Sequence, residues 1–145
     1  MHKELLSSAK SVEKVYNQLC EQVFLKYDIG KLELSILMFL EVNREATARD
    51  IVEINHVSKS SVSQAIDGLM KKGLVKGKHN EKDRRYVILE LEESAKEILQ
   101  EADQVNDEFQ KIVAAGIPQE DLAVFQRTLK HMLNNIVEAS KEIKN

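Results

Sequence analysis

Most apolar residues of this chain repeat at the spacing of one helix face. Two short segments in the middle of the chain have an extended pattern instead. The first stripe steps by four, three, four, three and four residues, the spacing of one helix face, and predicts a helix over about residues 3–27. Its members are Leu5, Ala9, Val12, Tyr16, Leu19 and Val23. After Asp28-Ile29-Gly30, residues 31–42 predict a second, largely buried helix with Leu34, Leu37 and Leu40 on one side.

A short third helix is expected to begin after Thr47 and to end near Asn55. Thr47 is a favourable N-cap residue, and Asp50, three positions later, completes an approximate capping box. Ile51 and Ile54 are expected to face inward.

A fourth helix is expected over about residues 59–72, with Ser58 as its N-cap and Gly73 at its C-terminal end. Its apolar stripe leaves small polar side chains on the opposite side. The stripe consists of Val62, Ile66 and Leu69. Two short helices joined by a tight turn predict a helix-turn-helix, with a plain helical hairpin as the alternative.

Two extended runs follow, at about residues 74–79 and 86–91, separated by the polar turn Asn80-Glu81-Lys82-Asp83. The second run is rich in β-branched and aromatic residues, so the pair predicts a β-hairpin. A hairpin directly after the second helix of a helix-turn-helix is a wing. The predicted fold class is therefore mainly α, of the α+β winged helix type, with a winged helix-turn-helix core and a two-stranded wing over about residues 31–92.

Two more long amphipathic helices are expected, at about residues 93–115 and from Pro118 to about residue 143, separated by Gly116-Ile117-Pro118. Three long helices and one small core cannot easily cover each other's apolar faces within one chain. We therefore predict a homodimer, with a monomer as the alternative. Residues 1–145 would form one domain, in which about residues 1–28 and 93–145 are a helical dimerisation region.

Charge is unevenly distributed along the chain. The window of residues 56–89 holds eight Lys or Arg and three Asp or Glu, a net charge of +5, whereas the whole chain carries −3 and the remainder therefore −8. A basic cluster in an acidic protein is typical of a surface that meets phosphate, and an ordinary solvated face is the alternative.

The remaining composition limits the possible classes of protein. The 145 residues contain 43% hydrophobic residues and no apolar run near the roughly 20 residues that span a bilayer. The N-terminus lacks the apolar segment of a signal peptide, and a single cysteine fits a reducing compartment, so we expect a cytoplasmic protein without membrane association. Scattered histidines and the absence of phosphate-loop or nucleophile motifs predict no metal, no cofactor and no enzyme activity.

The chain resembles the multiple-antibiotic-resistance-regulator (MarR) family of winged-helix transcription factors over essentially its full length. The resemblance rests on an ordered set of motifs at the family's spacing. These are Thr47-Ala48-Arg49-Asp50-Ile51-Val52, Val57-Ser58-Lys59-Ser60-Ser61-Val62-Ser63, Leu69-Met70-Lys71-Lys72-Gly73-Leu74-Val75, Asp83-Arg84-Arg85 and Val87-Ile88-Leu89-Glu90-Leu91.

The resemblance implies a two-fold symmetric dimer that places each recognition helix in the major groove of a pseudo-palindromic site in double-stranded DNA. In the wing it implies that Asp83 orients Arg85, which enters the minor groove, while Arg84, Lys78 and Lys82 meet phosphates. Gly77 departs from the family, which often has arginine there. The helix candidates for base-edge and phosphate contacts are Lys59, Ser60, Ser61, Ser63, Gln64 and Lys71.

The resemblance further implies a repressor that a small molecule, often aromatic or anionic, releases from its operator. Such ligands bind between the dimerisation helices and the core. The candidates for lining this pocket are Tyr16, Cys20, Tyr27 and Phe39, although core packing explains these residues equally well. Cys20 also suggests a redox-sensing regulator, but its short distance from the second helix favours a buried, inert cysteine.

One competing class remains open. A helical protein-protein interaction module could keep the same fold without specific DNA binding. The basic window argues against it, and a gel shift discriminates between the two.

Overall fold

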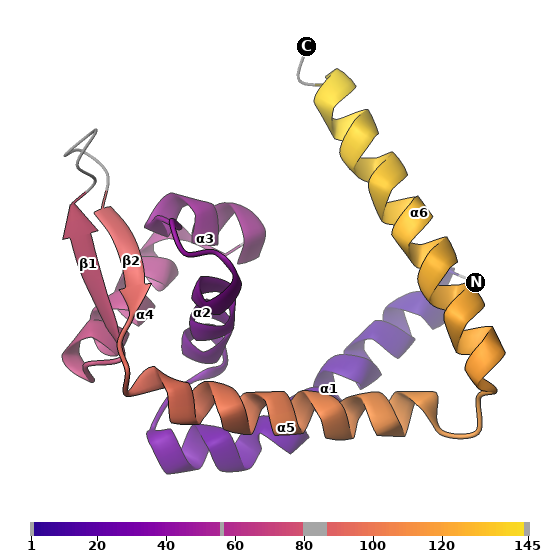
Figure 1. Cartoon of the computed structure of the whole chain (residues 1–145), viewed down its shortest axis with the longest axis horizontal. Helices are drawn as coiled ribbons and strands as arrows, with labels where there is room; N and C mark the ends of the chain where they lie inside the picture. Colours follow the sequence, from indigo (N-terminus) through magenta and orange to yellow (C-terminus); the bar gives the residue numbers. More distant parts are fainter. Residues whose placement is uncertain (1, 56, 80–86, 144–145) are drawn as a thin grey trace. The chain divides into compact units, whose positions relative to one another are not determined.

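A computed structural model of the chain describes residues 2–55, 57–79 and 87–143 and confirms a mainly helical fold with a two-stranded antiparallel sheet (Figure 1). By their internal contacts the elements form two compact units, Met1–Asp107 and Glu108–Asn145. The elements in chain order are α1 (His2–Tyr27), α2 (Lys31–Val42), α3 (Ala48–Asn55), α4 (Lys59–Lys71), β1 (Val75–His79), β2 (Val87–Leu91), α5 (Ala95–Ala114) and α6 (Gln119–Ile143).

The corner between α1 and α2 is sharply defined by main-chain hydrogen bonds. Asp28 adopts a left-handed conformation with φ of 50°, which aspartate tolerates better than most residues. The Ile29 amide donates to the Phe24 carbonyl at 3.1 Å, and this bond closes the end of α1. The Gly30 amide donates to the Glu33 carboxylate at 2.8 Å, so Glu33 caps the start of α2.

The core of the first unit lies between α2, α3, α4, β2 and the first half of α5. Helix α4 contacts α2, α3 and β1, and β2 contacts α2 and α3. The largest fully buried side chains are Ile36, Leu37, Ile51, Leu69, Ile98, Val62, Val75 and Cys20. The expectation that Ile54 faces inward is wrong, because its side chain is 57% exposed. Ile54 lies in the last turn of the eight-residue α3 and lines a cavity with Phe39 and Asp50.

The sheet is a short antiparallel ribbon in which Val75 pairs with Leu91 and Gly77 pairs with Leu89. A third segment, which the sequence did not indicate, joins β2 on its other side. Thr47 forms an isolated bridge with Ile88, and the Leu89 amide donates to the Ala46 carbonyl at 2.9 Å. These bonds fix the start of α3 against the ribbon.

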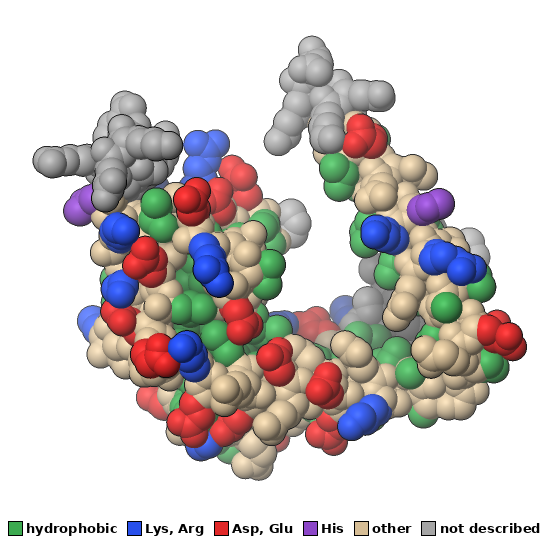
Figure 2. All heavy atoms as spheres, in the orientation of Figure 1, with side chains coloured by type: hydrophobic (Ala, Val, Ile, Leu, Met, Phe, Trp, Pro, Cys, Tyr) green, Lys and Arg blue, Asp and Glu red, His purple; other side chains and the backbone are tan. Residues whose placement is uncertain are grey.

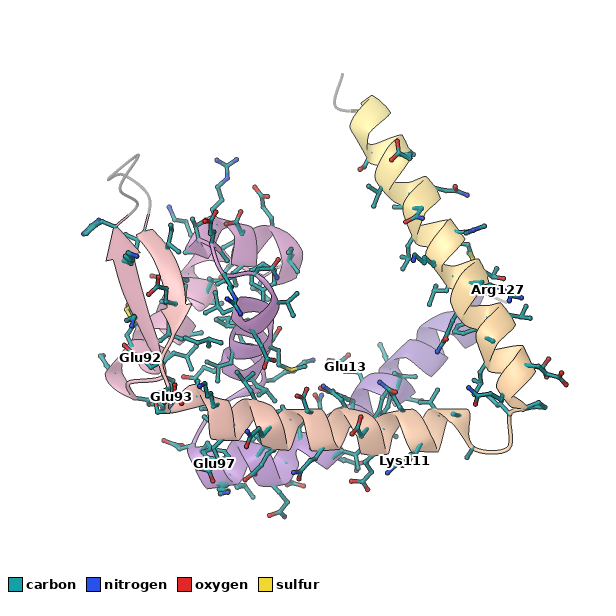
Figure 3. All side chains as sticks on the ribbon, in the orientation of Figure 1. Glu13, Glu92, Glu93, Glu97, Lys111 and Arg127 are labelled. Atoms are coloured by element: carbon teal, nitrogen blue, oxygen red, sulfur yellow. The ribbon has the colours of Figure 1, made fainter. Side chains whose placement is uncertain are left out.

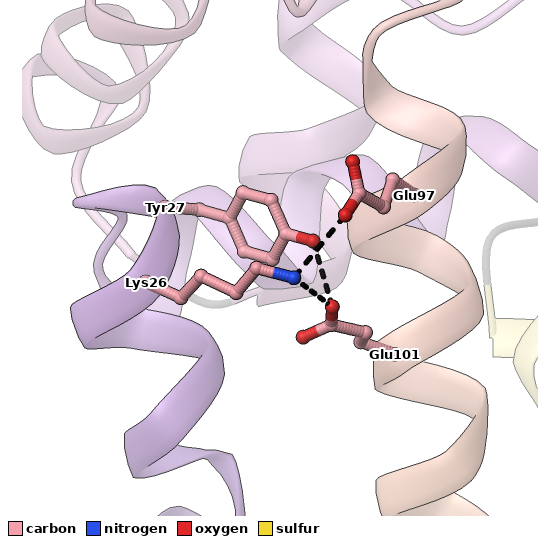
Figure 4. A network of polar contacts seen from close by, with 4 residues as sticks. All are labelled: Lys26, Tyr27, Glu97 and Glu101. Atoms are coloured by element: carbon pink, nitrogen blue, oxygen red, sulfur yellow. Dashed lines mark hydrogen bonds and ion pairs between the residues drawn. The ribbon is translucent and has the colours of Figure 1, made fainter.

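Polar contacts join α1 to the first half of α5 (Figure 4). The Lys26 ammonium binds the carboxylates of Glu97 and Glu101, and the Tyr27 hydroxyl donates to Glu101 at 2.9 Å. The Lys26 ammonium also lies 4.8 Å from the centre of the Tyr27 ring. Two helices that are far apart in the sequence are therefore held together at the end of α1.

The second unit consists of the end of α5 and all of α6, and many of its large apolar side chains are exposed. Phe125 and Ile136, for example, are each 62% exposed. The exposed apolar residues of this unit are Ile112, Val113, Ile117, Val124, Phe125, Leu129, Met132, Leu133, Ile136 and Val137. Despite this apolar face, no helix in the described ranges is sufficiently long and apolar to cross a bilayer.

Candidate nucleic-acid interface

The start of α4 is fixed by a serine cap. Ser58 has an extended backbone, with φ of −64° and ψ of 148°, and its hydroxyl accepts from the Ser61 amide at 3.1 Å. This bond satisfies one of the amides that a helix start leaves without a partner. At the other end, the Leu74 amide donates to the Leu69 carbonyl at 3.0 Å while Gly73 has φ of 67°. Both predicted ends of α4 are confirmed, since glycine adopts this left-handed conformation without strain.

The two faces of α4 differ in the way the apolar stripe predicted. Val62, Ile66 and Leu69 are buried in the core. Outside this stripe the helix carries short hydroxyl side chains, one amide, two ammonium groups and the carboxylate of Asp67, all exposed. Besides Asp67, these exposed residues are Lys59, Ser60, Ser61, Ser63, Gln64 and Lys71.

One of these candidates has a second role within the helix. The Ser61 Oγ lies 2.8 Å from the Ser58 Oγ, in addition to the capping bond that the Ser61 amide makes. Its hydroxyl is therefore already engaged at the start of α4. Ser60, Ser63 and Gln64 are exposed beside it.

Helix α3, which precedes α4, begins with the predicted capping box. The Asp50 carboxylate accepts from the Thr47 amide and the Thr47 hydroxyl, each at 2.7 Å. Two hydrogen bonds from Thr47 lower the pKa of Asp50 below its ordinary value, and the bond from the backbone amide contributes more than the bond from the side chain. The box fixes α3, and α3 packs on α4.

Acidic side chains face the lysines of the wing stem. Lys78 lies 3.9 Å from Glu90, and Lys76 lies 3.9 Å from Glu90 and 3.7 Å from Glu92. Figure 3 shows Glu92 and Glu93 where β2 leads into α5. On the face of the molecule seen in Figure 2, blue and red side chains alternate over the first unit. Part of the charge of the basic window is therefore balanced by acids that lie just outside it in the sequence.

The wing-tip candidates lie outside the described residues. These are Lys82, Asp83, Arg84 and Arg85, and their assigned roles in the wing stay predictions.

Gly77, in the stem of the wing, occupies a position with little space for a side chain. A Cβ on Gly77 would lie 2.9 Å from Val87 Cγ1 and 3.4 Å from Met70 Cε. A side chain such as the family's arginine would therefore first meet Val87 of the neighbouring strand β2, which would have to shift. Close packing against Val87 within the ribbon is the structural counterpart of this departure from the family.

The four pocket candidates do not share a cavity among those found in the described part of the chain. Tyr16 lines a cavity of about 250 Å³ between α1 and α2, together with Asn17, Phe24, Lys31, Leu34, Ser35 and Met38. Phe39 lines another, of about 360 Å³, with Asp50 and Ile54. The Tyr27 hydroxyl binds Glu101, and Cys20 is fully buried in the core.

Burial also determines the protonation of Tyr16 and Cys20. It raises the pKa of Tyr16 to about 12, with a smaller contribution from Cys20. Burial likewise raises the pKa of the Cys20 thiol. A buried thiol with a raised pKa lacks both the access and the thiolate character of a redox sensor. No group of His, Cys, Asp and Glu side chains in the described ranges is arranged to hold a metal ion.

One polar link near α4 was not evident from the sequence. The Lys72 ammonium, at the end of α4, lies 3.2 Å from the Glu33 carboxylate in α2. The two residues are 39 positions apart, and neither belongs to a periodic pattern that predicts the contact. Glu33, three residues after Gly30, carried only the local signal of a helix cap.

The architecture and the exposed face of α4 define this chain as a winged helix-turn-helix protein. A model of the MarR family matches residues 27–85, from the end of α1 into the wing. Over these residues the chain is similar to the MarR family, and the curated relatives that it resembles are named as transcription regulators.

Two curated relatives come from Bacillus subtilis (strain 168). The uncharacterized HTH-type transcriptional regulator YfiV is 36% identical over 75 residues, which cover 52% of this chain and 47% of YfiV. The HTH-type transcriptional repressor YetL is 25% identical over 100 residues, which cover 68% of this chain and 60% of YetL. The chain thus spans about half the length of the curated relatives it matches.

Solved structures share the fold over most of the chain. A crystal structure of MarR superposes with a TM-score of 0.79 at 15% identity and covers 97% of this chain and 93% of its own. A MarR transcriptional regulator from Methanosarcina mazei Go1 gives 0.77 at 20% identity, covering 93% and 98%. A mutant of S. aureus MepR bound to an oligodeoxyribonucleotide gives 0.60 at 19% identity, covering 94% and 98%.

Proposed function

We propose that this chain is a transcription regulator that binds double-stranded DNA with sequence specificity, and that it does so as a homodimer. The observation that carries the proposal is the division of α4 into a buried apolar stripe and an exposed surface of hydroxyl, amide and ammonium groups with one carboxylate, that of Asp67. An α-helix of this kind fits the major groove, where a glutamine can pair with adenine and serine can serve several bases. Gln64 is the candidate for the specific base contact.

The charge around α4 supports contact with phosphate. Lys59 and Lys71 are exposed and make no ion pair within the described ranges. The pairs that Lys76 and Lys78 make with Glu90 and Glu92 are long, at 3.7 to 3.9 Å, and partly exposed. Such surface pairs contribute about 1 kcal/mol or less, so a phosphate can replace the carboxylates.

The exposed apolar face of α6 supports the homodimer. Phe125, Leu129, Met132 and Ile136 repeat at helical spacing and are 41% to 62% exposed. An apolar stripe of this length on a protein surface marks an interaction site. A second copy of the same helix would cover it with a complementary stripe, which is how a two-fold dimer forms.

A role as a repressor released by a small ligand is the finer part of the proposal. YetL, the relative matched over 68% of this chain, is a repressor. The cavity between α1 and α2 is lined by Tyr16, Asn17 and Lys31, and the Lys31 ammonium binds the exposed carboxylate of Glu13, which an anionic ligand could replace. The Asn17 Oδ1 is buried and finds no hydrogen-bond partner in the described part of the chain. A small aromatic acid that donates one hydrogen bond matches these groups.

The experiment that tests the proposal selects duplexes from a randomised pool with the wild-type protein and measures affinities by gel shift. Gln64→Ala is expected to relax preference at one position in each half-site, because a bidentate base contact is worth about 1–3 kcal/mol. Arg85→Ala is expected to weaken binding most where the flanks are A/T-rich and the minor groove is narrow. Asp83→Ala should act as a milder Arg85→Ala. Gln100 is an exposed residue of α5, and Gln100→Ala is the matched control for Gln64→Ala. It should change neither the affinity nor the base preference.

The protein-protein interaction module is the second candidate. It is favoured by the acids that face Lys72, Lys76 and Lys78, which lower the free positive charge of the basic window. Failure of the wild-type protein to enrich any duplex would support this alternative against the DNA-binding proposal. Cys20 carries no further candidate function because its thiol is inaccessible.

A further inference from the structure

A polar cluster joins the C-terminal end of α4 to the corner between α1 and α2. The Lys72 ammonium donates to the two oxygens of Glu33, at 3.2 and 3.3 Å, and to the main-chain carbonyl of Asp28. The same carboxylate accepts from the Gly30 amide at 2.8 Å. We refer to Asp28, Gly30, Glu33 and Lys72 as the corner cluster.

The ion pair in this cluster is the most enclosed of the pairs within the described ranges. The Glu33 side chain is 16% exposed and the Lys72 side chain 31%. In contrast, the Lys96–Glu93 pair at the start of α5 has exposures of 66% and 83%. Shielding from water and additional hydrogen bonds make a charged contact stronger and more directional than a surface pair. Lys72 and Glu33 therefore hold α4 and α2 in a defined relation.

A glycine in the middle of α4 allows this contact. A Cβ on Gly68 would lie 2.7 Å from Glu33 Oε1, closer than any Cβ can approach an oxygen without displacing it. Glycine weakens a helix interior relative to alanine. Its presence here fits a need for the α4 backbone to lie directly against the Glu33 carboxylate.

The corner cluster also connects α4 to the helices that flank the core. Asp28 directly follows α1, and the preceding residues Lys26 and Tyr27 bind Glu97 and Glu101 of α5. The main chain at the end of α1 therefore joins two sets of polar contacts, one with α5 and one with the end of α4. Together with the apolar packing of α4, this corner contributes to the orientation of α4 relative to α1 and α5.

We propose that Glu33 and Lys72 are positioning residues for DNA recognition. They hold α4 at the orientation to α1 and α5 that fixes the separation of the two recognition helices in the dimer. This inference rests on the proposed function, since it needs a dimer that binds two half-sites. In such dimers the spacing of the half-sites follows from the separation of the two helices.

Glu33→Gln separates a positioning role from a general electrostatic effect, because the two predict opposite changes in the affinity for the selected duplex. Gln keeps an oxygen that can accept from the Gly30 amide, but it removes one negative charge from each protomer. General electrostatics alone would tighten binding to every duplex. Loss of positioning should weaken binding to the duplex selected by the wild-type protein while binding to a scrambled duplex stays equal or tightens. We expect the ratio of the two affinities to fall by at least about fivefold.

The spacing of the half-sites gives a second readout that a purely structural role would not change. The selected duplex is compared with versions in which one base pair is inserted or removed between the half-sites. The wild-type protein should discriminate strongly between them, and Glu33→Gln should discriminate less. Lys72→Met should give the same loosening. The double variant should add little beyond either single variant, since both remove one contact.

Glu93→Gln is the matched control, because it makes the same charge change at an exposed carboxylate outside the corner cluster. It should preserve the affinity ratio and the spacing preference. Circular dichroism at the assay temperature establishes that each variant is folded. Unchanged ratio and spacing preference in both Glu33→Gln and Lys72→Met would overturn the positioning role alone. A wild-type protein that enriches no duplex would overturn the proposed function, and the positioning role with it.

Discussion

The Tyr16 hydroxyl donates a hydrogen bond to Asn106 Oδ1 at 2.8 Å and so joins α1 to α5 across 90 residues of sequence. Both side chains are partly buried, and the neighbouring Cys20 is fully buried. The bond lies beside the cavity between α1 and α2, which Tyr16 also lines. It therefore contributes to the packing of the flanking helices and to the shape of that cavity.

Tyr16→Phe is expected to lower the free energy of unfolding by about 0.5–1.5 kcal/mol, the net contribution of one such bond. The ring stays, so the apolar packing around Cys20 should change little. Chemical denaturation of the wild-type protein and the variant measures the difference. An unchanged free energy of unfolding would show that water replaces the hydroxyl without loss.

Gly68→Ala should have a more favourable effect on stability when the Glu33 carboxylate is absent. In the wild-type protein the added methyl group has to displace this carboxylate, the end of a flexible side chain, which lies 2.7 Å from the ideal Cβ position. In a Glu33→Ala background the obstacle is gone, and the same substitution should stabilise the helix by about 0.5–1 kcal/mol. Denaturation of the four proteins in this cycle measures the difference between the two backgrounds. An equal effect of Gly68→Ala in both backgrounds would contradict the close approach.

Ser58 and Ser60 are two positions apart in the sequence, but they have different roles in the structure. Ser58→Ala removes the hydroxyl that accepts from the Ser61 amide and should cost about 1 kcal/mol of stability. Ser60→Ala, on the exposed face of α4, should leave stability unchanged and weaken DNA binding. Thermal unfolding and gel shifts on both variants compare the two effects. Equal losses of stability in the two variants would contradict the assignment of Ser58 to the helix cap and of Ser60 to DNA binding.

The Asp50 capping box predicts a stability change in acid. Hydrogen bonds from Thr47 lower the pKa of Asp50 in the folded state, so its contribution is complete above the ordinary pKa of about 3.9 and is lost as the pH falls through the lowered value. Asp50→Asn should therefore be less stable than the wild-type protein near neutrality, and the gap should shrink towards pH 3. Urea unfolding at several pH values measures the gap. A gap that stays constant down to pH 3 would contradict the role of the ionised carboxylate.

The sequence predicted the features that local chemistry determines. Helical periodicity located α1 to α6, and Thr47 with Asp50, Ser58 and Gly73 marked ends that the structure confirms. These signals act within a few residues, so one sequence suffices to identify them.

Long-range contacts were not predictable from the same signals. No sequence pattern indicates that Glu33 meets Lys72, because a helix stripe does not specify which partner faces a polar residue. The basic window was counted without Glu90 and Glu92, which face its lysines only once the register of the ribbon is known. The apolar spacing of Ile51 and Ile54 predicts that both face inward, but such spacing does not show how much of α3 the core covers, and Ile54 is 57% exposed.

Sequence-specific DNA binding by α4 and the wing is tested by the salt dependence of affinity. The dissociation constants of the wild-type protein for its selected duplex and for a scrambled duplex are measured between about 50 and 200 mM salt. Binding to the selected duplex should be tighter at every salt concentration. The slope of log affinity against log salt should be about −5 or steeper, as expected when at least about six phosphates per dimer are neutralised. Equal affinity for the two duplexes, or an affinity that does not change with salt, would contradict specific DNA binding.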